Sequence, residues 1–224
     1  MKLNVVLRQL KSMADPEAVK GMARFGISAA NTLGVSIPAL RKMAREIGKD
    51  HELALQLWDS GIHEARLLAG FIDDPAQVTD RQLEEWAEGF DSWDVCDQAC
   101  SNLFDKTDSA WQKAVEWSAR PEEFVKRAGF ALMAALAVHD KAATDRQFEG
   151  LFPLIKREAG DERNYVRKAV NWALRQIGKR NVRLNRKAIK VAQEIRKMDS
   201  KSARWIAADA LRELASPAVQ GRLA

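Results

Sequence analysis

The residues best suited to chemistry in this chain lie at positions 90–104, in the segment FDSWDVCDQACSNLF. On a helix, Trp93 and Asp97 are four residues apart and therefore lie on one face, a single turn from each other. This spacing pairs an indole surface with a carboxylate, and Asp94 could reach the same side. An acid in the first turn of a helix can stabilise the helix by its interaction with the helix dipole. This explanation is weaker for Asp97, because Asp97 lies further along the helix. For Trp93 two interpretations stay open, a core anchor or part of a site.

A second segment, NYVRKAVNWALRQIGKRN at residues 164–181, combines an aromatic residue with several cations. Helical spacing places on one stripe Lys168, Trp172, Arg175 and Lys179. Such a stripe suits a nucleic acid, because cations neutralise phosphates while a flat ring packs on a sugar or base. Alternatively, Trp172 anchors the helix to a neighbour, and the stems of Lys and Arg cover the ring. The pattern alone leaves both interpretations open.

A third segment, PEEFVKRAGFAL at residues 121–132, contains Lys126 and Arg127 directly before an apolar run. We expect these two cations to emerge at the rim of a groove. A charge beside a buried helix is usually just solvated. The segment is therefore weak evidence when taken by itself.

The net charge of +5 hides a strong polarity along the chain. Residues 156–204 contain 16 Lys and Arg against 5 Asp and Glu, whereas residues 1–155 carry a net charge of −6. A basic block beside an acidic remainder is typical of proteins that bind a polyanion, and it favours DNA as the partner. The alternative is a solvated basic face without a partner.

Apolar residues recur at three- and four-residue spacing along almost the whole chain, without strand-like alternation, which predicts roughly twelve helices. The clearest lie at residues 36–48, 50–59, 62–72, 79–89, 92–104, 108–118, 121–138, 144–158, 162–179, 183–197 and 201–215. Boundaries are indicated by Pro38 and Pro121 in first turns, Gly48 after a last turn, and Thr79 and Thr144 as N-caps. Short connections between such helices predict antiparallel hairpins.

Four helices share a charged opening followed by Ala and large apolar residues: EARLLAGFI at 64–72, KRAGFALMA at 126–134, RKAVNWALR at 167–175 and SARWIAADAL at 202–211. Ala128 and Ala169 are 41 residues apart, and Ala169 and Ala203 are 34 apart, near the period of HEAT or armadillo repeats. We therefore predict an all-α fold, a right-handed superhelical solenoid of antiparallel helix pairs. The second helix of each pair would line a concave basic groove.

Nothing in the composition divides residues 1–224, since the chain has only 12 Gly and 6 Pro and no linker-like tract, so we expect a single domain. The N-terminal stretch lacks the apolar run of a secretion signal, and no run approaches a membrane span. We expect a cytoplasmic protein. Cys96 and Cys100 are interpreted as core thiols, and with 3 His in the chain we expect no metal site.

The three segments together resemble a known family. WDVCD at 93–97, VKRAG at 125–129 and KAVNWALRQIGKRN at 168–181 look like the signatures of the AlkD-like DNA alkylation repair proteins, which are HEAT-like-repeat DNA glycosylases. The resemblance runs from about residue 20 to residue 215, and it includes LGVSIPALRKMAREIGKD and LWDSGIHEARLLAGFIDDP.

The resemblance implies roles for single residues. Asp97 matches the family's catalytic carboxylate, and Trp93 and Trp172 match its two sugar-facing tryptophans. Phe25 falls near a position where the family usually has tyrosine, so the ring is kept and the hydroxyl is lost. Arg127 matches an arginine that contacts the DNA backbone. Further backbone contacts are expected from Lys126, Lys168, Arg175, Lys179 and Arg180.

The implied activity is excision of positively charged N-alkylated purines, 3-methyladenine and 7-methylguanine, from duplex DNA. The family approaches the backbone and leaves the lesion in the base stack, so a basic face rather than a deep pocket would be the active surface. Because no Schiff-base lysine stands out, we expect a monofunctional enzyme without a cofactor, acting as a monomer on DNA that contains alkylated bases.

Two other functions compete with this interpretation. The first is a non-catalytic member of the same superfamily that binds branched or damaged DNA. Retention of Asp97 argues against it, because a pure binder gains nothing from an acid facing phosphates. The second is a protein-binding repeat scaffold, which the basic segment disfavours without excluding an acidic protein partner.

Overall fold

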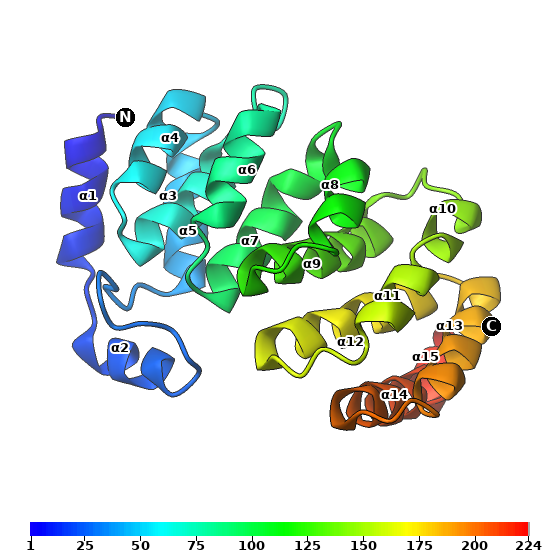
Figure 1. Cartoon of the computed structure of the whole chain (residues 1–224). Coiled ribbons are helices and arrows are strands. Elements are labelled where there is room, and N and C mark those ends of the chain that lie inside the picture. Colours follow the sequence, from blue (N-terminus) through cyan, green and yellow to red (C-terminus); the bar gives the residue numbers. More distant parts are fainter. Residues whose placement is uncertain (224) are drawn as a thin grey trace. The chain divides into compact units, whose positions relative to one another are not determined.

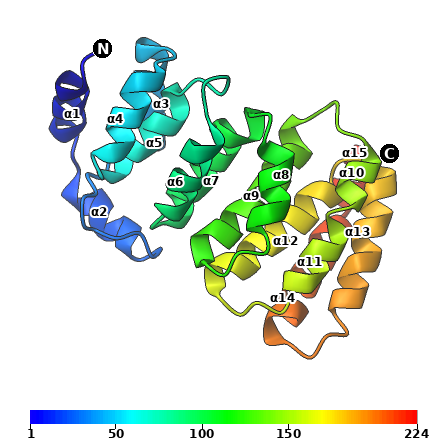
Figure 2. The same ribbon diagram turned by 45° about the horizontal axis from the view of Figure 1, so that its top comes forward.

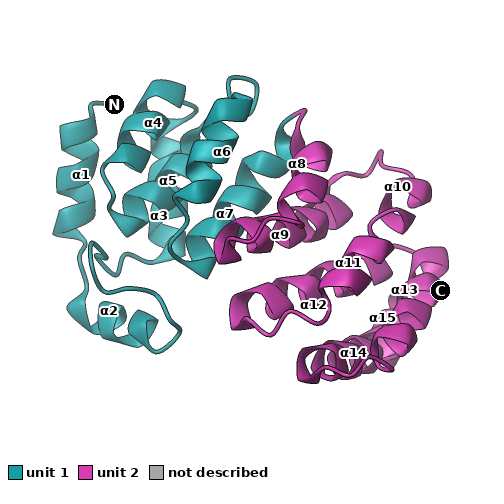
Figure 3. Ribbon diagram, viewed as in Figure 1, with its two compact units in different colours: residues 1–107 teal, residues 108–224 magenta. Residues whose placement is uncertain are grey.

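The computed structural model describes residues 1–223, and these are helical with no strand among them. Contacts between Cα atoms divide the chain into two compact units, Met1–Thr107 and Asp108–Ala224, which Figure 3 draws in teal and magenta. The predicted all-α fold of packed helix pairs is confirmed. The single domain, the handedness and the concave groove concern both units together and stay predictions.

Unit 1 is a small stack of helices with α5 at its centre (Figure 1). Its helices are α1 (Leu3–Ser12), α2 (Pro16–Ala23), α3 (Ile37–Ile47), α4 (His51–Asp59), α5 (His63–Ile72), α6 (Asp80–Glu88) and α7 (Trp93–Asn102), followed by the short 3-10 helix η1 (Phe104–Lys106). Helix α5 packs against α4 in a hairpin and also against α3 and α7. Helices α3, α5 and α7 therefore form one packed row.

Unit 2 is also a stack of packed helices (Figure 2), and four of its helices are longer than any helix of unit 1. Its helices are α8 (Ala110–Trp117), α9 (Glu123–His139), α10 (Asp145–Glu149), α11 (Phe152–Glu158), α12 (Asn164–Gly178), α13 (Val182–Ile195), α14 (Lys201–Leu214) and α15 (Pro217–Leu223). Pairs form between α8 and α9, α11 and α12, and α13 and α14, while α12 packs between α9 and α14. Helix α9 is buried along most of its length, so it forms the core of this unit.

Most of the expected boundary residues lie at helix ends. Thr79 Oγ1 accepts a hydrogen bond from the Gln82 N–H at 3.2 Å, and Thr144 forms a capping box with Gln147. Gly48 follows α3 with φ 77°, a left-handed conformation that favours glycine.

Two boundaries differ from the prediction. The helix expected at 144–158 is split into α10 and α11, because Pro153 lies in the first turn of α11 and has no N–H to continue the preceding helix. Pro121 was expected in the first turn of a helix but lies before α9, which begins at Glu123. Helices α1, α2 and α15 add to the ranges that the sequence indicated. Within residues 1–223, no helix is long and apolar enough to cross a membrane.

Candidate nucleic-acid interface

Trp93 and Asp97 lie on α7 as predicted, one at the start of the helix and the other a turn later, and both are half-buried. The Trp93 Nε1–H donates a hydrogen bond to the backbone oxygen of Phe25 at 3.1 Å, across 68 residues of sequence. Phe25 follows α2 and leaves 70% of its surface exposed. Unit 1 therefore brings together an exposed phenyl ring, an indole and the helix that bears the candidate carboxylate.

The opposite face of α7 is packed into an apolar core. Cys96 and Cys100 are buried thiols that form no disulfide, as predicted, and burial raises the pKa of Cys100. An aromatic cluster lies nearby, in which the Trp58 and Trp86 rings stack with centroids 4.2 Å apart. Phe104 packs against Trp86 with centroids 6.1 Å apart. Helix α7 itself packs against α5 and η1, and these contacts position it in the unit.

Two residues of α5 fix the N-terminal end of α7. His63 Nε2 lies 2.9 Å from Asp94 Oδ2, and His63 is only 6% exposed. Arg66 donates a hydrogen bond to the Gly89 carbonyl at 3.2 Å and forms an ion pair with Asp91 at 3.3 Å. Asp94 is therefore a positioning residue for α7, which the sequence had only placed near Asp97.

The charges of this pair shift two pKa values in opposite directions. Burial by itself lowers the pKa of His63, but the hydrogen bond and charge of Asp94, with the charges of Glu64 and Asp91, raise it above its ordinary value. Burial tends to raise the pKa of Asp94, yet hydrogen bonding and charge from His63 leave it lowered. The pair is therefore stabilised as imidazolium and carboxylate.

Glu64, the residue after His63, holds the loop that follows Phe25. Its buried carboxylate accepts hydrogen bonds from the Leu33 N–H at 2.8 Å and the Gly34 N–H at 2.6 Å. The His63 N–H also donates to the Asn31 carbonyl at 2.9 Å. Neither role was predicted from the sequence, although adjacent His and Glu residues in the apolar run IHEARLLAGFI indicate buried polar contacts.

In unit 2, the stripe on α12 is only partly available to a polyanion. Lys168 is exposed and Trp172 is half-buried. Arg175 and Lys179, however, both form ion pairs with Glu213 of α14, the latter at 2.6 Å. The continuous cationic stripe expected from the sequence is therefore interrupted, because a helix that lies 34 to 38 residues away supplies the compensating acid.

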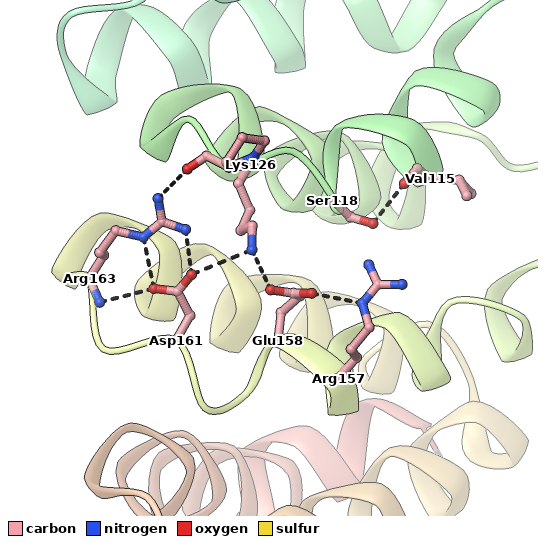
Figure 4. A network of polar contacts seen from close by, with 8 residues as sticks. Val115, Ser118, Lys126, Arg157, Glu158, Asp161 and Arg163 are labelled. Atoms are coloured by element: carbon pink, nitrogen blue, oxygen red, sulfur yellow. Dashed lines mark hydrogen bonds and ion pairs between the residues drawn. The ribbon is translucent and has the colours of Figure 1, made fainter.

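The expected exposure of Lys126 and Arg127 is wrong. Lys126 is 9% exposed and Arg127 is 5% exposed. Figure 4 shows Lys126 between Glu158 and Asp161, with its Nζ 3.6 Å from the latter carboxylate. The Arg127 guanidinium donates to the Tyr165 carbonyl at 2.6 Å. Both cations lie inside the unit because α9 is its central helix, packed against α8 and α12.

The same network holds the loop between α11 and α12. Arg163 binds Asp161 (Figure 4). The Arg163 guanidinium also donates to the Pro121 carbonyl at 2.6 Å. Burial tends to raise the pKa of Asp161, but hydrogen bonds and charge from Arg163, with the charge of Lys126, keep it lowered. The VKR portion of the motif thus joins α9 to the next helix pair.

Arg180 also has a structural environment. It donates hydrogen bonds to the carbonyls of Ala137 at 3.0 Å and Ala143 at 3.1 Å. Its guanidinium lies 4.5 Å from the centroid of the Phe148 ring. Its expected contact with a DNA backbone stays a prediction.

The structure gathers the candidate residues into two groups, one in each unit. Phe25, Trp93 and Asp97 belong to unit 1, whereas Trp172 and the cations of α12 belong to unit 2. Within residues 1–223, no group of three or more His, Cys, Asp or Glu side chains could hold a metal ion.

The comparison with known families decides what these helices belong to. The model of the DNA alkylation repair enzyme family matches residues 6–214. The chain belongs to that family. The matched range contains Trp93, Asp97 and Trp172 and confirms the resemblance drawn from the sequence.

Two relatives of this protein match most of its chain. Uncharacterized protein Lin0241 of Listeria innocua serovar 6a is 24% identical over 85% of this chain and 84% of its own length. Uncharacterized protein Lmo0209 of Listeria monocytogenes serovar 1/2a is 23% identical with the same coverage. A solved structure with TM-score 0.81 and 20% identity covers 100% of this chain and 96% of its own. It is described as a new family related to the HEAT-like repeat DNA glycosylases with affinity for branched DNA structures, and it confirms the HEAT-like fold.

Proposed function

We propose that the protein is a monofunctional DNA glycosylase that excises cationic N-alkylated purines, such as 3-methyladenine and 7-methylguanine, from duplex DNA. The observation that carries the proposal is the arrangement on α7, where Asp97 follows Trp93 by one turn and Phe25 lies beside Trp93. Together they offer a carboxylate next to aromatic surfaces on a rigid helix.

The reaction breaks the bond between N9 of the alkylated purine and C1′ of the deoxyribose. The base leaves with the bonding electrons and becomes neutral, so it needs no strong general acid. The sugar gains oxocarbenium character, which the Asp97 carboxylate stabilises. A water molecule adds to C1′, and its proton passes to Asp97 and then to solvent, leaving an abasic site.

The aromatic residues would act on the same developing charge. An electron-rich indole face beside the sugar contributes about 0.5–2 kcal/mol through cation–π attraction. We assign this role to Trp93, and the sugar-facing role that the family resemblance implies for Trp172 stays a prediction. Phe25 offers an exposed ring to the DNA near Trp93.

The proposal is tested by base release from methylated duplex DNA. Wild type is expected to release 3-methyladenine or 7-methylguanine, and Asp97→Asn to lower the rate by about 100-fold or more, because the charge on the carboxylate is removed. DNA affinity should persist. Asp59→Asn, which makes the same substitution at an exposed position of unit 1, is the control and should keep full activity. The assignment is wrong if wild type releases no alkylated base or if Asp97→Asn is as active as wild type.

A second candidate is a non-catalytic binder of branched DNA. Two observations favour it: Phe25 stands where a tyrosine is usual, and Arg127 is buried with its guanidinium on a backbone carbonyl. The solved relative is described as having affinity for branched DNA structures. This function would be supported by preferential binding of a four-way junction over linear duplex together with an absence of base release.

A further inference from the structure

A small basic pocket lies in unit 1, away from the aromatic residues of the proposed site. It encloses about 240 Å³. Its charged lining consists of Arg41, Arg45, Lys49 and Lys106. The cations come from α3, from the turn after it and from η1, and Phe71 of α5 and Asn102 of α7 complete the wall.

Four cations at one pocket are unexpected in this unit. Residues 1–107 contain 12 Lys and Arg against 17 Asp and Glu, a net charge of −5. The unit therefore contains enough Asp and Glu for every Lys and Arg to form an ion pair. The pocket instead concentrates positive charge, which raises its affinity for an anion.

The partners of these cations are neutral oxygens. Arg41 donates to the side-chain oxygens of Gln98 at 3.3 Å and Asn102 at 3.2 Å. Lys49 donates to the backbone carbonyl of Asp73, and Lys106 to that of Asn102. Among residues 1–223, no carboxylate forms an ion pair with any of the four cations. Their charge is thus left for a ligand.

The side chain of Asp73, whose backbone carbonyl accepts from Lys49, is engaged elsewhere. Asp73 is fully buried, and its carboxylate binds His51 at 2.6 Å and Gln82 at 2.6 Å. The pKa of Lys49 is lowered by burial and by the like charge of Lys106, which outweigh the charges of Asp73 and Asp74. Repulsion between two lysines of one pocket is relieved when an anion binds between them.

Arg41 is held in place before any ligand binds. Its guanidinium carbon lies 4.8 Å from the centroid of the Phe71 ring, and its two hydrogen bonds reach α7. Gln98 is the residue after Asp97, and Asn102 ends the same helix. Five residues of helix rise about 7.5 Å, or about two nucleotide steps of B-DNA. The pocket and the candidate carboxylate are therefore fixed on one element at nucleotide-scale separation.

We propose that this pocket binds one backbone phosphate of the DNA, close to the lesion, and so sets the register of α7 on the strand. The inference rests on the proposed function, and it adds a phosphodiester site in the otherwise acidic unit. The phosphate oxygens would accept charge-assisted hydrogen bonds from Arg45, Lys49 and Lys106, with Arg41 as the preorganised fourth donor.

The test compares two double variants with the same loss of charge. Arg45→Gln with Lys106→Gln removes two pocket cations, whereas Arg8→Gln with Lys42→Gln removes two exposed cations of unit 1 outside the pocket. Affinity for a duplex with one central abasic-site analogue is measured by fluorescence anisotropy over a range of salt. We expect the pocket variant to bind about 10-fold more weakly and its salt slope to fall by about 0.9, since one phosphate contact is lost. The control variant should change affinity less than twofold.

A scan with neutral methylphosphonates, one per duplex, locates the phosphate. Wild type should lose affinity at one position near the lesion, and the pocket variant should not respond at that position. Equal loss of affinity in both double variants would overturn the proposal. A second combination of results would also overturn it: inorganic phosphate protects wild type against thermal unfolding, and the pocket variant keeps its DNA affinity. The pocket would then bind free phosphate rather than a phosphate of DNA. Neither experiment depends on base release. Failure of the pocket proposal can therefore be distinguished from failure of the proposed reaction.

Discussion

Two acids within one turn of α7 have different tasks. Asp94 is bound to His63 and holds the helix against α5. Asp97, one turn after Trp93, is the carboxylate that we assign to the reaction. A histidine beneath a catalytic helix couples the geometry of the site to pH, since its charge changes near neutrality.

Replacing His63 should reveal this coupling. A raised His63 pKa means that its contribution to stability is complete below the ordinary value of 6.5 and is lost as pH rises through the raised value. The lowered pKa of Asp94 makes its contribution complete above 3.8 and lost on further acidification. His63→Gln should therefore lower the free energy of unfolding by about 1–3 kcal/mol at pH 6, and by less at pH 9.

Thermal unfolding of wild type and His63→Gln between pH 5 and pH 9 measures this difference. Arg8→Gln, which removes an exposed cation of α1, is the control and should follow wild type. A difference between wild type and His63→Gln that stays constant or grows toward pH 9 would contradict the charged pair.

At the scale of elements, the VKRAG motif explains how α8 and α9 approach each other. A Cβ atom on Gly129 would lie 2.5 Å from the Ser118 nitrogen and 2.9 Å from the Trp117 carbonyl carbon. These are backbone atoms of the preceding helix and its end, so no side-chain movement relieves the overlap. Lys126, three residues earlier, joins the next pair. One motif therefore fixes both neighbours of α9.

Gly129→Ala is expected to destabilise the protein by about 1–3 kcal/mol, because the two backbones must separate. The matched control is Gly21→Ala in α2, where a Cβ meets no atom within 4 Å. That variant should be neutral or stabilising by up to about 1 kcal/mol through helix propensity. Chemical denaturation of both variants checks the prediction, which fails if Gly129→Ala is as stable as Gly21→Ala.

At the scale of the whole molecule, the two units carry opposite charge. Unit 1 has a net charge of −5, whereas residues 108–224 contain 24 Lys and Arg against 14 Asp and Glu, a net charge of +10. Ion pairs compensate many of these cations. Within residues 156–204, six cations have neither an ion pair with a carboxylate nor a side-chain hydrogen bond or ring contact: Lys168, Arg186, Lys190, Arg196, Lys197 and Lys201.

These six cations set an expectation for the salt dependence of DNA binding. If each contacts one phosphate, the logarithm of affinity should fall with the logarithm of salt with a slope of about −5. Anisotropy titrations of undamaged duplex between 50 and 200 mM salt measure the slope. Absence of binding at the lowest salt would eliminate both DNA-binding functions and favour the protein-binding scaffold.

Features that depend on neighbours along the chain could be predicted from the sequence alone. Apolar spacing of three and four residues predicted the all-α fold, and the step from Trp93 to Asp97 placed both on one helix face, because helix geometry is local. One of the predicted helices, 144–158, is broken at Pro153, because proline has no N–H to continue the preceding helix, and this rule is local as well.

Which cations find a compensating acid or carbonyl depends on the tertiary structure. Arg127 binds a carbonyl 38 residues away, Arg175 an acid 38 residues away, and Trp93 a carbonyl 68 residues away. The cations of the basic pocket likewise meet only because α3, α5 and α7 pack as one row. Charge is additive along a sequence, but its availability to DNA depends on burial and on partners that packing brings from distant helices.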